Sequence, residues 1–309
     1  MPRLGAISVD LDSLPHYCRI QGLPESLLDE RARRLVADVA IPRLLELFGG
    51  LPATFFVIGA DVALPGMPEA LARAAAAGVE LASHSFSHDY AISRWSRPDI
   101  EADLARAETA LAAVGVSPRG FRAPGYTLSP ALLSAVAARG YEYDSSTFPA
   151  TPYYLAKAGV MGALSLLRRP SRAILDRPRV LGAPRVPYRP SLTEPYARGD
   201  APLVELPMAV APFTRLPFIG TLATSLPWPL VTSVFRSLRG DALLNFELHA
   251  IDVLDGSDGV PPALVRQQRD LRVPAREKLE RLRTLFRWLG EARQRVTVLD
   301  AARALRSTL

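Results

Sequence analysis

The sequence predicts an α/β protein built around a parallel β-sheet. Short apolar runs rich in β-branched and aromatic residues alternate with longer helical segments, and glycines end several of those helices. The alternation is regular before residue 150 and returns after residue 240. The pattern is compatible with an open sheet and with a sheet closed into a barrel.

The elements of the first half follow one another in order. A helical stretch over 26–48 is expected to be interrupted near Pro42, since proline cannot donate a main-chain hydrogen bond, and Gly49-Gly50 ends it. Further helices open at Ser96 and Ser129, which are good N-cap residues. Strands are expected at 4–9, 53–58, 79–82, 119–121 and 141–143, and helices at 26–48, 68–77, 96–114 and 129–139.

Residues 150–240 differ in composition from the flanking segments. They hold nearly half of the 28 prolines, arginines at Arg168, Arg169 and Arg172, a helix candidate at 160–167 and a proline-broken apolar stretch at 217–234. We therefore expect one domain over 1–309 with a Pro/Arg-rich insertion at about 150–240. The alternation then resumes with a strand at 242–248, a helix at 275–290, a strand at 296–299 and a helix at 301–305.

Composition excludes several classes of protein. Of the 309 residues, 49% are hydrophobic and 22% charged, which excludes a disordered chain, and no run of 18 apolar residues predicts a membrane-spanning helix. The single cysteine, Cys18, excludes a disulfide framework and a multi-cysteine metal site. No leader peptide is recognised, so a cytoplasmic location is expected.

The formal net charge of +6 comes from arginine, because Lys157 and Lys278 are the only lysines. A basic protein can bind nucleic acid, an anionic membrane or an anionic substrate. No basic-aromatic motif for nucleic acid is present, so no nucleic-acid partner is expected.

Two aspartates follow the first predicted strand directly. Asp10 and Asp12 lie two residues apart, so on a strand both carboxylates would point to one face. Sites of parallel α/β folds form at this end of the strands. Two acids there repel each other unless a proton or a cation lies between them. The alternative is a turn in which an aspartate caps a helix.

Two histidines follow a later strand. His84 and His88 are four residues apart, which on a helical turn would let both imidazoles hold one metal ion. Together with Asp12 they would make an Asp-His-His site whose open positions are typical of catalytic zinc. The alternative is a pair of loop histidines bonded to the main chain.

Two further motifs end predicted strands. The segment 120–126 contains Arg122, a natural partner for a site carboxylate, and Pro124-Gly125, whose backbone could present N–H groups to an anion. His249 ends the strand at 242–248. Each alone could be an ordinary loop or structural residue. Their shared position at strand ends favours one site.

The order of these motifs resembles the polysaccharide deacetylase family, also called the chitooligosaccharide deacetylase homology domain. The resemblance covers about 1–150 and 200–305 and rests on Asp10/Asp12, 53–59, 84–88, 122–125, 144–146 and 248–249. It implies a distorted (β/α) barrel of seven or eight strands. It also implies an enzyme that uses a divalent metal to remove acyl groups from sugar amides.

The resemblance implies a role for each site residue. Asp12, His84 and His88 would hold the metal, zinc being expected and cobalt, nickel and iron being alternatives. Asp10 would be the general base, oriented by Arg122, and His249 the general acid, with Asp144 or Asp252 as its carboxylate partner. The residues expected at the oxyanion and substrate are Gly125, Tyr126 and Ser145.

Two departures from the common pattern indicate an atypical cytoplasmic branch. The first motif reads Asp-x-Asp, and 249–252 is similar to the His-Ala-Glu of deformylases acting on undecaprenyl-phosphate-linked amino sugars. The expected substrate is thus an N-acetylated or N-formylated amino sugar of a polysaccharide or glycolipid. Peripheral contact with an anionic inner membrane is a further expectation. The alternatives are an amidohydrolase acting on a small cyclic imide or ureide, and a binding barrel with a relic site.

Overall fold

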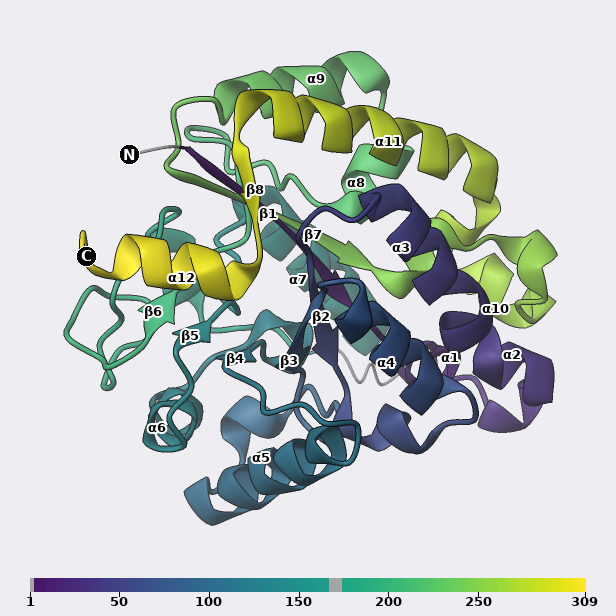
Figure 1. The fold of residues 1–309 in the computed structure, drawn as a ribbon, viewed down its shortest axis with the longest axis horizontal. Helices are drawn as coiled ribbons and strands as arrows, with labels where there is room; N and C mark the ends of the chain where they lie inside the picture. The colour runs from purple at the N-terminus through teal and green to yellow at the C-terminus, as the bar shows by residue number, and fades with distance from the viewer. Residues whose placement is uncertain (1–2, 167–173) are drawn as a thin grey trace.

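The computed structural model describes residues 3–166 and 174–309, and within them eight parallel strands form one sheet (Figure 1). The strand order is β6-β5-β4-β3-β2-β1-β7, and β8 pairs with the first half of β1. The strands are β1 (Leu4–Asp10), β2 (Thr54–Val57), β3 (Glu80–Ser83), β4 (Gly120–Phe121), β5 (Tyr143–Asp144), β6 (Val204–Glu205), β7 (Leu243–His249) and β8 (Gln294–Val296).

The sheet curls so that its two ends, β6 and β7, approach each other. The N–H of Ala209, which follows β6, donates to the carbonyl of Asn245 on β7 at 3.0 Å. The side-chain amide of Asn245 donates to the carbonyl of Leu206, also at 3.0 Å. The predicted α/β fold with a distorted barrel is confirmed as a half-barrel of parallel strands.

Helices cover the outside of the curled sheet (Figure 1). The largest apolar cluster packs α3 and α11 against the central strands, with the ring of Phe48 6.0 Å from that of Phe286. The helices are α1 (Leu14–Ile20), α2 (Glu30–Leu35), α3 (Ile41–Phe48), α4 (Met67–Ala76), α5 (Arg97–Ala112), α6 (Pro130–Ala138), α7 (Thr151–Leu166), α8 (Gly220–Ser225), α9 (Trp228–Ser237), α10 (Pro262–Gln267), α11 (Ala275–Ala292) and α12 (Val298–Arg306).

Strand β1 is the centre of the molecule. All seven of its residues are buried, and it pairs with β7 along its whole length and with β2 and β8 on its other side. A continuous apolar run is typical of a parallel strand covered on both faces. The strand therefore carries Asp10 to a fixed point inside the curled sheet.

The structure refines several predicted elements. The interruption expected near Pro42 is a π turn over Val36–Ala40, after which the helix continues as α3 with the proline in its first turn. The predicted strand at 296–299 is wrong in its second half. The Thr297 side chain accepts from the N–H of Asp300 and caps α12, so Val298 and Leu299 are helical.

The 150–240 segment contributes to the barrel as well as to its surroundings. Strand β6 lies within it and was not expected, because two residues among prolines carry no periodic signal. The helix candidate at 160–167 is part of α7, which already begins at Thr151. Arg168, Arg169 and Arg172 lie outside the described residues. No helix of the described part combines the length and apolarity that crossing a bilayer requires.

Candidate active site

A cavity of about 370 Å³ lies at the carboxyl ends of the strands. It brings together side chains that follow β1, β3, β4 and β7, as parallel topology predicts. From the strand ends, the lining residues are Asp10, Asp12, His84, His88, Tyr90, Gly125, Tyr126 and His249. Of the nine predicted site residues, only Arg122 and Ser145 are absent from this lining.

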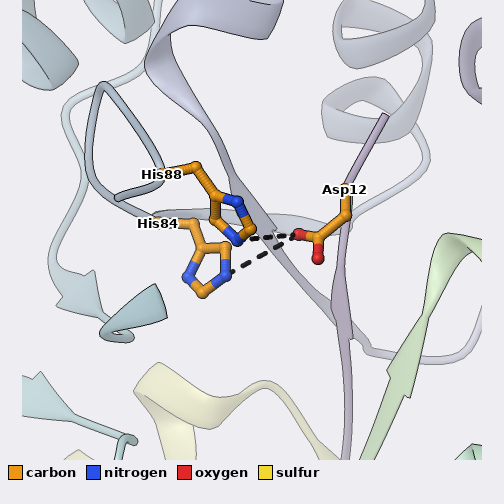
Figure 2. A group of neighbouring side chains, drawn as sticks. All are labelled: Asp12, His84 and His88. Carbon is orange, nitrogen blue, oxygen red and sulfur yellow. Dashed lines mark ion pairs between the residues drawn. The ribbon is translucent and has the colours of Figure 1, made fainter. Parts of the chain in front are cut away.

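Asp12, His84 and His88 point toward one another (Figure 2). The Oδ1 atom of Asp12 lies 3.4 Å from His88 Nε2 and 3.7 Å from His84 Nε2. His84 Nδ1 lies 2.8 Å from the carbonyl of Arg122. Because a carbonyl only accepts hydrogen bonds, Nδ1 carries the proton of a neutral His84 ring and Nε2 offers a lone pair.

The electrostatics of this group fit a divalent cation. Asp12 Oδ1 is buried without a hydrogen-bond partner among the described residues. Burial and the neighbouring histidines hold the pKa of His88 well below its ordinary value, so its ring is neutral. A carboxylate oxygen and two imidazole nitrogens thus face one space, and this donor set with nitrogen and oxygen atoms suits zinc.

The two histidines lie on a loop, so the predicted helical turn is wrong. Ser85 and His88 have φ angles of 62° and 51°, in the left-handed region. The carboxylate of Asp103 on α5 holds this backbone by accepting from the N–H groups of Phe86 at 2.8 Å and Ser87 at 3.1 Å. The loop, rather than a helical repeat, brings the two rings together.

Asp10 is held by a fully buried arginine. Arg122 donates to Asp10 Oδ1 at 2.5 Å, to the Ser145 carbonyl at 2.8 Å and to the Ser8 hydroxyl at 2.9 Å. Burial alone would raise the pKa of Asp10, but the charge of Arg122, with those of His84 and His249, lowers it. Asp10 Oδ2 has no hydrogen-bond partner within the described part of the chain and lies 3.8 Å from His84 Nε2, so this ionised oxygen can accept a proton.

Ser145 has a different setting from the one expected at the substrate. Its hydroxyl accepts from Arg122 at 3.0 Å and from the Asn245 amide at 2.9 Å, and donates to the Leu206 carbonyl at 2.9 Å. The residue is fully buried. It therefore supports Arg122 from behind, and through it Asp10.

His249 is paired with a carboxylate that the sequence analysis missed. Glu247 Oε1 lies 2.9 Å from His249 Nδ1. Burial would lower the pKa of His249, but the charge and hydrogen bond of Glu247 raise it well above the ordinary value. Side chains alternate along a strand, so residues 247 and 249 of β7 lie on one face. This spacing could have identified Glu247 as the partner of His249 from the sequence. His249 Nε2 lies 3.1 Å from the hydroxyl of Tyr126, whose pKa burial raises, so the phenol stays protonated.

Neither carboxylate expected beside the His249 ring is there. Asp252 accepts from the main-chain N–H of His249 at 2.9 Å. Asp144 pairs with Glu205 across β5 and β6, and both side chains are fully buried. Oδ2 of Asp144 and Oε2 of Glu205 each lack a hydrogen-bond partner among the described residues, and burial together with the charge of Asp144 raises the pKa of Glu205 well above its ordinary value. The pair therefore holds a proton.

Helix α7 forms part of the cavity wall. Its lining residues recur at helical spacing and are mostly apolar, namely Tyr153, Ala156, Lys157, Val160 and Met161. Three other large aromatic residues, Trp228, Tyr188 and Tyr196, are absent from this lining. The rings of Trp228 and Trp288 lie 5.4 Å apart, and Tyr188 and Tyr196 are buried.

Comparison with known proteins agrees with the fold and the motifs. Residues 41–143 match the polysaccharide deacetylase family model. A peptidoglycan deacetylase of Helicobacter pylori is 30% identical over 156 residues, which are 49% of this chain and 53% of the relative, so the chain spans about half of that relative's length. A candidate polysaccharide deacetylase from Mycobacterium smegmatis has the same fold, with a TM-score of 0.61 and 19% identity over 100% of this chain and 92% of that one. Residues 41–143 are therefore similar to the polysaccharide deacetylase family, and the described residues share the fold of the Mycobacterium smegmatis protein.

Proposed function

We propose that the chain is a metal-dependent hydrolase that removes an N-acyl group, acetyl or formyl, from an amino sugar of a polysaccharide or a lipid-linked glycan. One observation carries the proposal. The lone pairs of Asp12, His84 and His88 face one space beside an ionised carboxylate, Asp10, and a protonated imidazole, His249. Amide hydrolysis requires this combination of a base, an acid and a polarising group.

The residues divide the reaction between them. Asp12, His84 and His88 would hold the divalent metal, zinc in our proposal, which when bound polarises the acyl carbonyl and acidifies water. Asp10 Oδ2 takes a proton from the attacking water, whose oxygen forms a bond to the acyl carbon. His249 gives its Nε2 proton to the amide nitrogen as the carbon–nitrogen bond breaks. The products are a carboxylic acid and an amine.

The apolar residues of α7 in the cavity wall indicate the kind of substrate. The apolar stripe of α7 lines the same cavity as the polar strand ends, which favours a sugar attached to an apolar carrier over the interior of a hydrated polymer. Lys157 on the same stripe can attract an anionic group of such a carrier. This substrate would place the enzyme in the cytoplasm, at the surface of the inner membrane.

A second candidate function also has support from the cavity. A volume of about 370 Å³ with one apolar wall suits a compact molecule. Ring opening of a cyclic imide or ureide needs the same base, acid and polarising group. An amidohydrolase acting on such a small molecule is therefore the alternative.

Acid release separates these functions. Acetate and formate are measured after incubation with N-acetylated sugar oligomers or a bacterial glycolipid extract, and ring opening is measured with cyclic imides, each with and without chelator. Release from a sugar substrate that chelator abolishes and zinc restores supports the proposal, and the D10N variant should release about 10²–10⁴-fold less acid. Metal binding without release from either sugar substrate would overturn it, and ring opening of imides would then establish the alternative.

A further inference from the structure

A second cavity, of about 620 Å³, lies at the opposite end of the sheet. It is lined by residues around the start of β1, by α9 and by the end of α11 (Figure 1). The seven residues of β1 separate it from Asp10, a distance of about 20 Å at about 3.3 Å per residue. We call it the arginine cavity, after Arg3, Arg236, Arg239 and Arg293 in its lining.

The positive charge of the arginine cavity is not neutralised within the part of the chain that the structure describes. Arg3, Arg236 and Arg239 are exposed, and none forms an ion pair with a described carboxylate. Glu291 is the one carboxylate in the lining, and it lies 4.0 Å from Arg287. Like charges held together in this way attract an anion.

The cavity is also a built site rather than a scatter of surface arginines. Arg293 is buried and donates to the carbonyls of Asp241 at 2.7 Å and Leu4 at 3.1 Å, which fixes its position. Arg3 donates to the carbonyl of Arg239 at 2.7 Å, which joins the N-terminal segment to the residues after α9. These bonds fix the guanidinium groups of Arg293 and Arg3 beside the space that Arg236 and Arg239 also line.

An aromatic wall completes the arginine cavity. The rings of Phe235 on α9 and Trp288 on α11 both line it, and their centroids lie 5.7 Å apart. The Thr232 hydroxyl adds a polar group. Planar guanidinium forks match the oxygens of phosphate better than a lysine point charge does.

We propose that the arginine cavity binds a phosphate-bearing anion, at a site separate from the candidate active site. The phosphate oxygens would accept from Arg236 and Arg239, and Arg3 would add charge. A soluble diphosphate and the headgroup of an anionic phospholipid share this chemistry, and the experiment distinguishes them. The inference does not depend on the proposed function, because no residue of the candidate active site takes part.

Binding is measured with the full chain by calorimetry and by the tryptophan fluorescence that Trp288 contributes. The probes are sodium diphosphate, and vesicles of phosphatidylglycerol compared with vesicles of phosphatidylcholine. The double variant R236Q/R239Q should weaken binding about tenfold or more. Added salt should weaken it as well. R276Q is the control, because Arg276 is exposed on α11, outside the cavity lining, and pairs with Glu280.

Each outcome bears on the proposal. Binding of diphosphate that is lost in R236Q/R239Q supports a soluble ligand, and binding of phosphatidylglycerol vesicles alone supports a headgroup. Absence of binding to both probes, or equal binding by the wild type and the folded double variant, overturns it. D10N should bind as the wild type does, so loss of catalysis and loss of this site are distinguishable.

Discussion

Replacing Glu247 by glutamine should move the alkaline limit of activity to lower pH. His249 must be protonated to serve as the general acid, and the carboxylate 2.9 Å from its Nδ1 raises its pKa. For charge centres about 4 Å apart at an effective dielectric constant of about 20, the attraction is about 4 kcal/mol. Removal of this attraction lowers the pKa of His249 toward that of an imidazole without a charged partner.

The glutamine oxygen can still accept from Nδ1–H, so the ring keeps its orientation while the charge is removed. We therefore expect the alkaline limb of the kcat/KM profile to move to lower pH, with activity near pH 6 best preserved. Acid release is measured from pH 5 to 10. D252N is the control, because Asp252 contacts the main-chain N–H rather than the ring and should move the limb less. An unmoved limb in folded E247Q would refute the assignment of His249 as the acid held by Glu247.

Three other variants test the rest of the network. D10N should keep its affinity for zinc, measured by calorimetry, and lose activity by about 10²–10⁴-fold; full activity would exclude Asp10 as the base. R122M should lower the free energy of unfolding, measured in urea, by about 3–5 kcal/mol, because it leaves Asp10 buried and unpaired. The control is R119M at an exposed ion pair, which should lower it by less than about 1 kcal/mol. Glu205 keeps its proton in the fold above the pH at which the unfolded chain releases it, so its contribution to stability is complete at low pH and declines as pH rises through the raised pKa. E205Q should reduce that decline between pH 5 and 8 in urea unfolding, and an unchanged decline would contradict the shared proton.

Residues near the ends of strands were the part of the site most open to prediction. Asp10, His84 and Arg122 follow strands that are visible as apolar runs, and parallel topology brings such ends together. Glu247 was missed because a carboxylate within an apolar strand was not read together with the histidine two positions later. The role of Ser145 could not be predicted, because its partners Asn245 and Leu206 are distant in sequence.

The fold, like the site, could be predicted in part from the sequence. The long helices and buried strands outside 150–240 carry periodic signals, so their order was foreseen, whereas α7 was recognised only in its second half and α9 was not predicted as a helix. The two-residue strand β6 carries none, since its position depends on pairing with β5. At Thr297 the sequence signal was misleading. The β-branched run around it predicts a strand, but its side chain caps α12, so the residues after it are helical.

The support of the histidine loop by Asp103 has a consequence for engineering. The positions of His84 and His88 depend on a carboxylate that reaches the loop from α5, and the four-residue spacing does not determine them alone. Residues 84–88 grafted onto another scaffold would supply the histidine nitrogens, but they would lack the Asp103 carboxylate that fixes the loop backbone. The smallest portable form of this centre is therefore the loop together with the helix that bears Asp103.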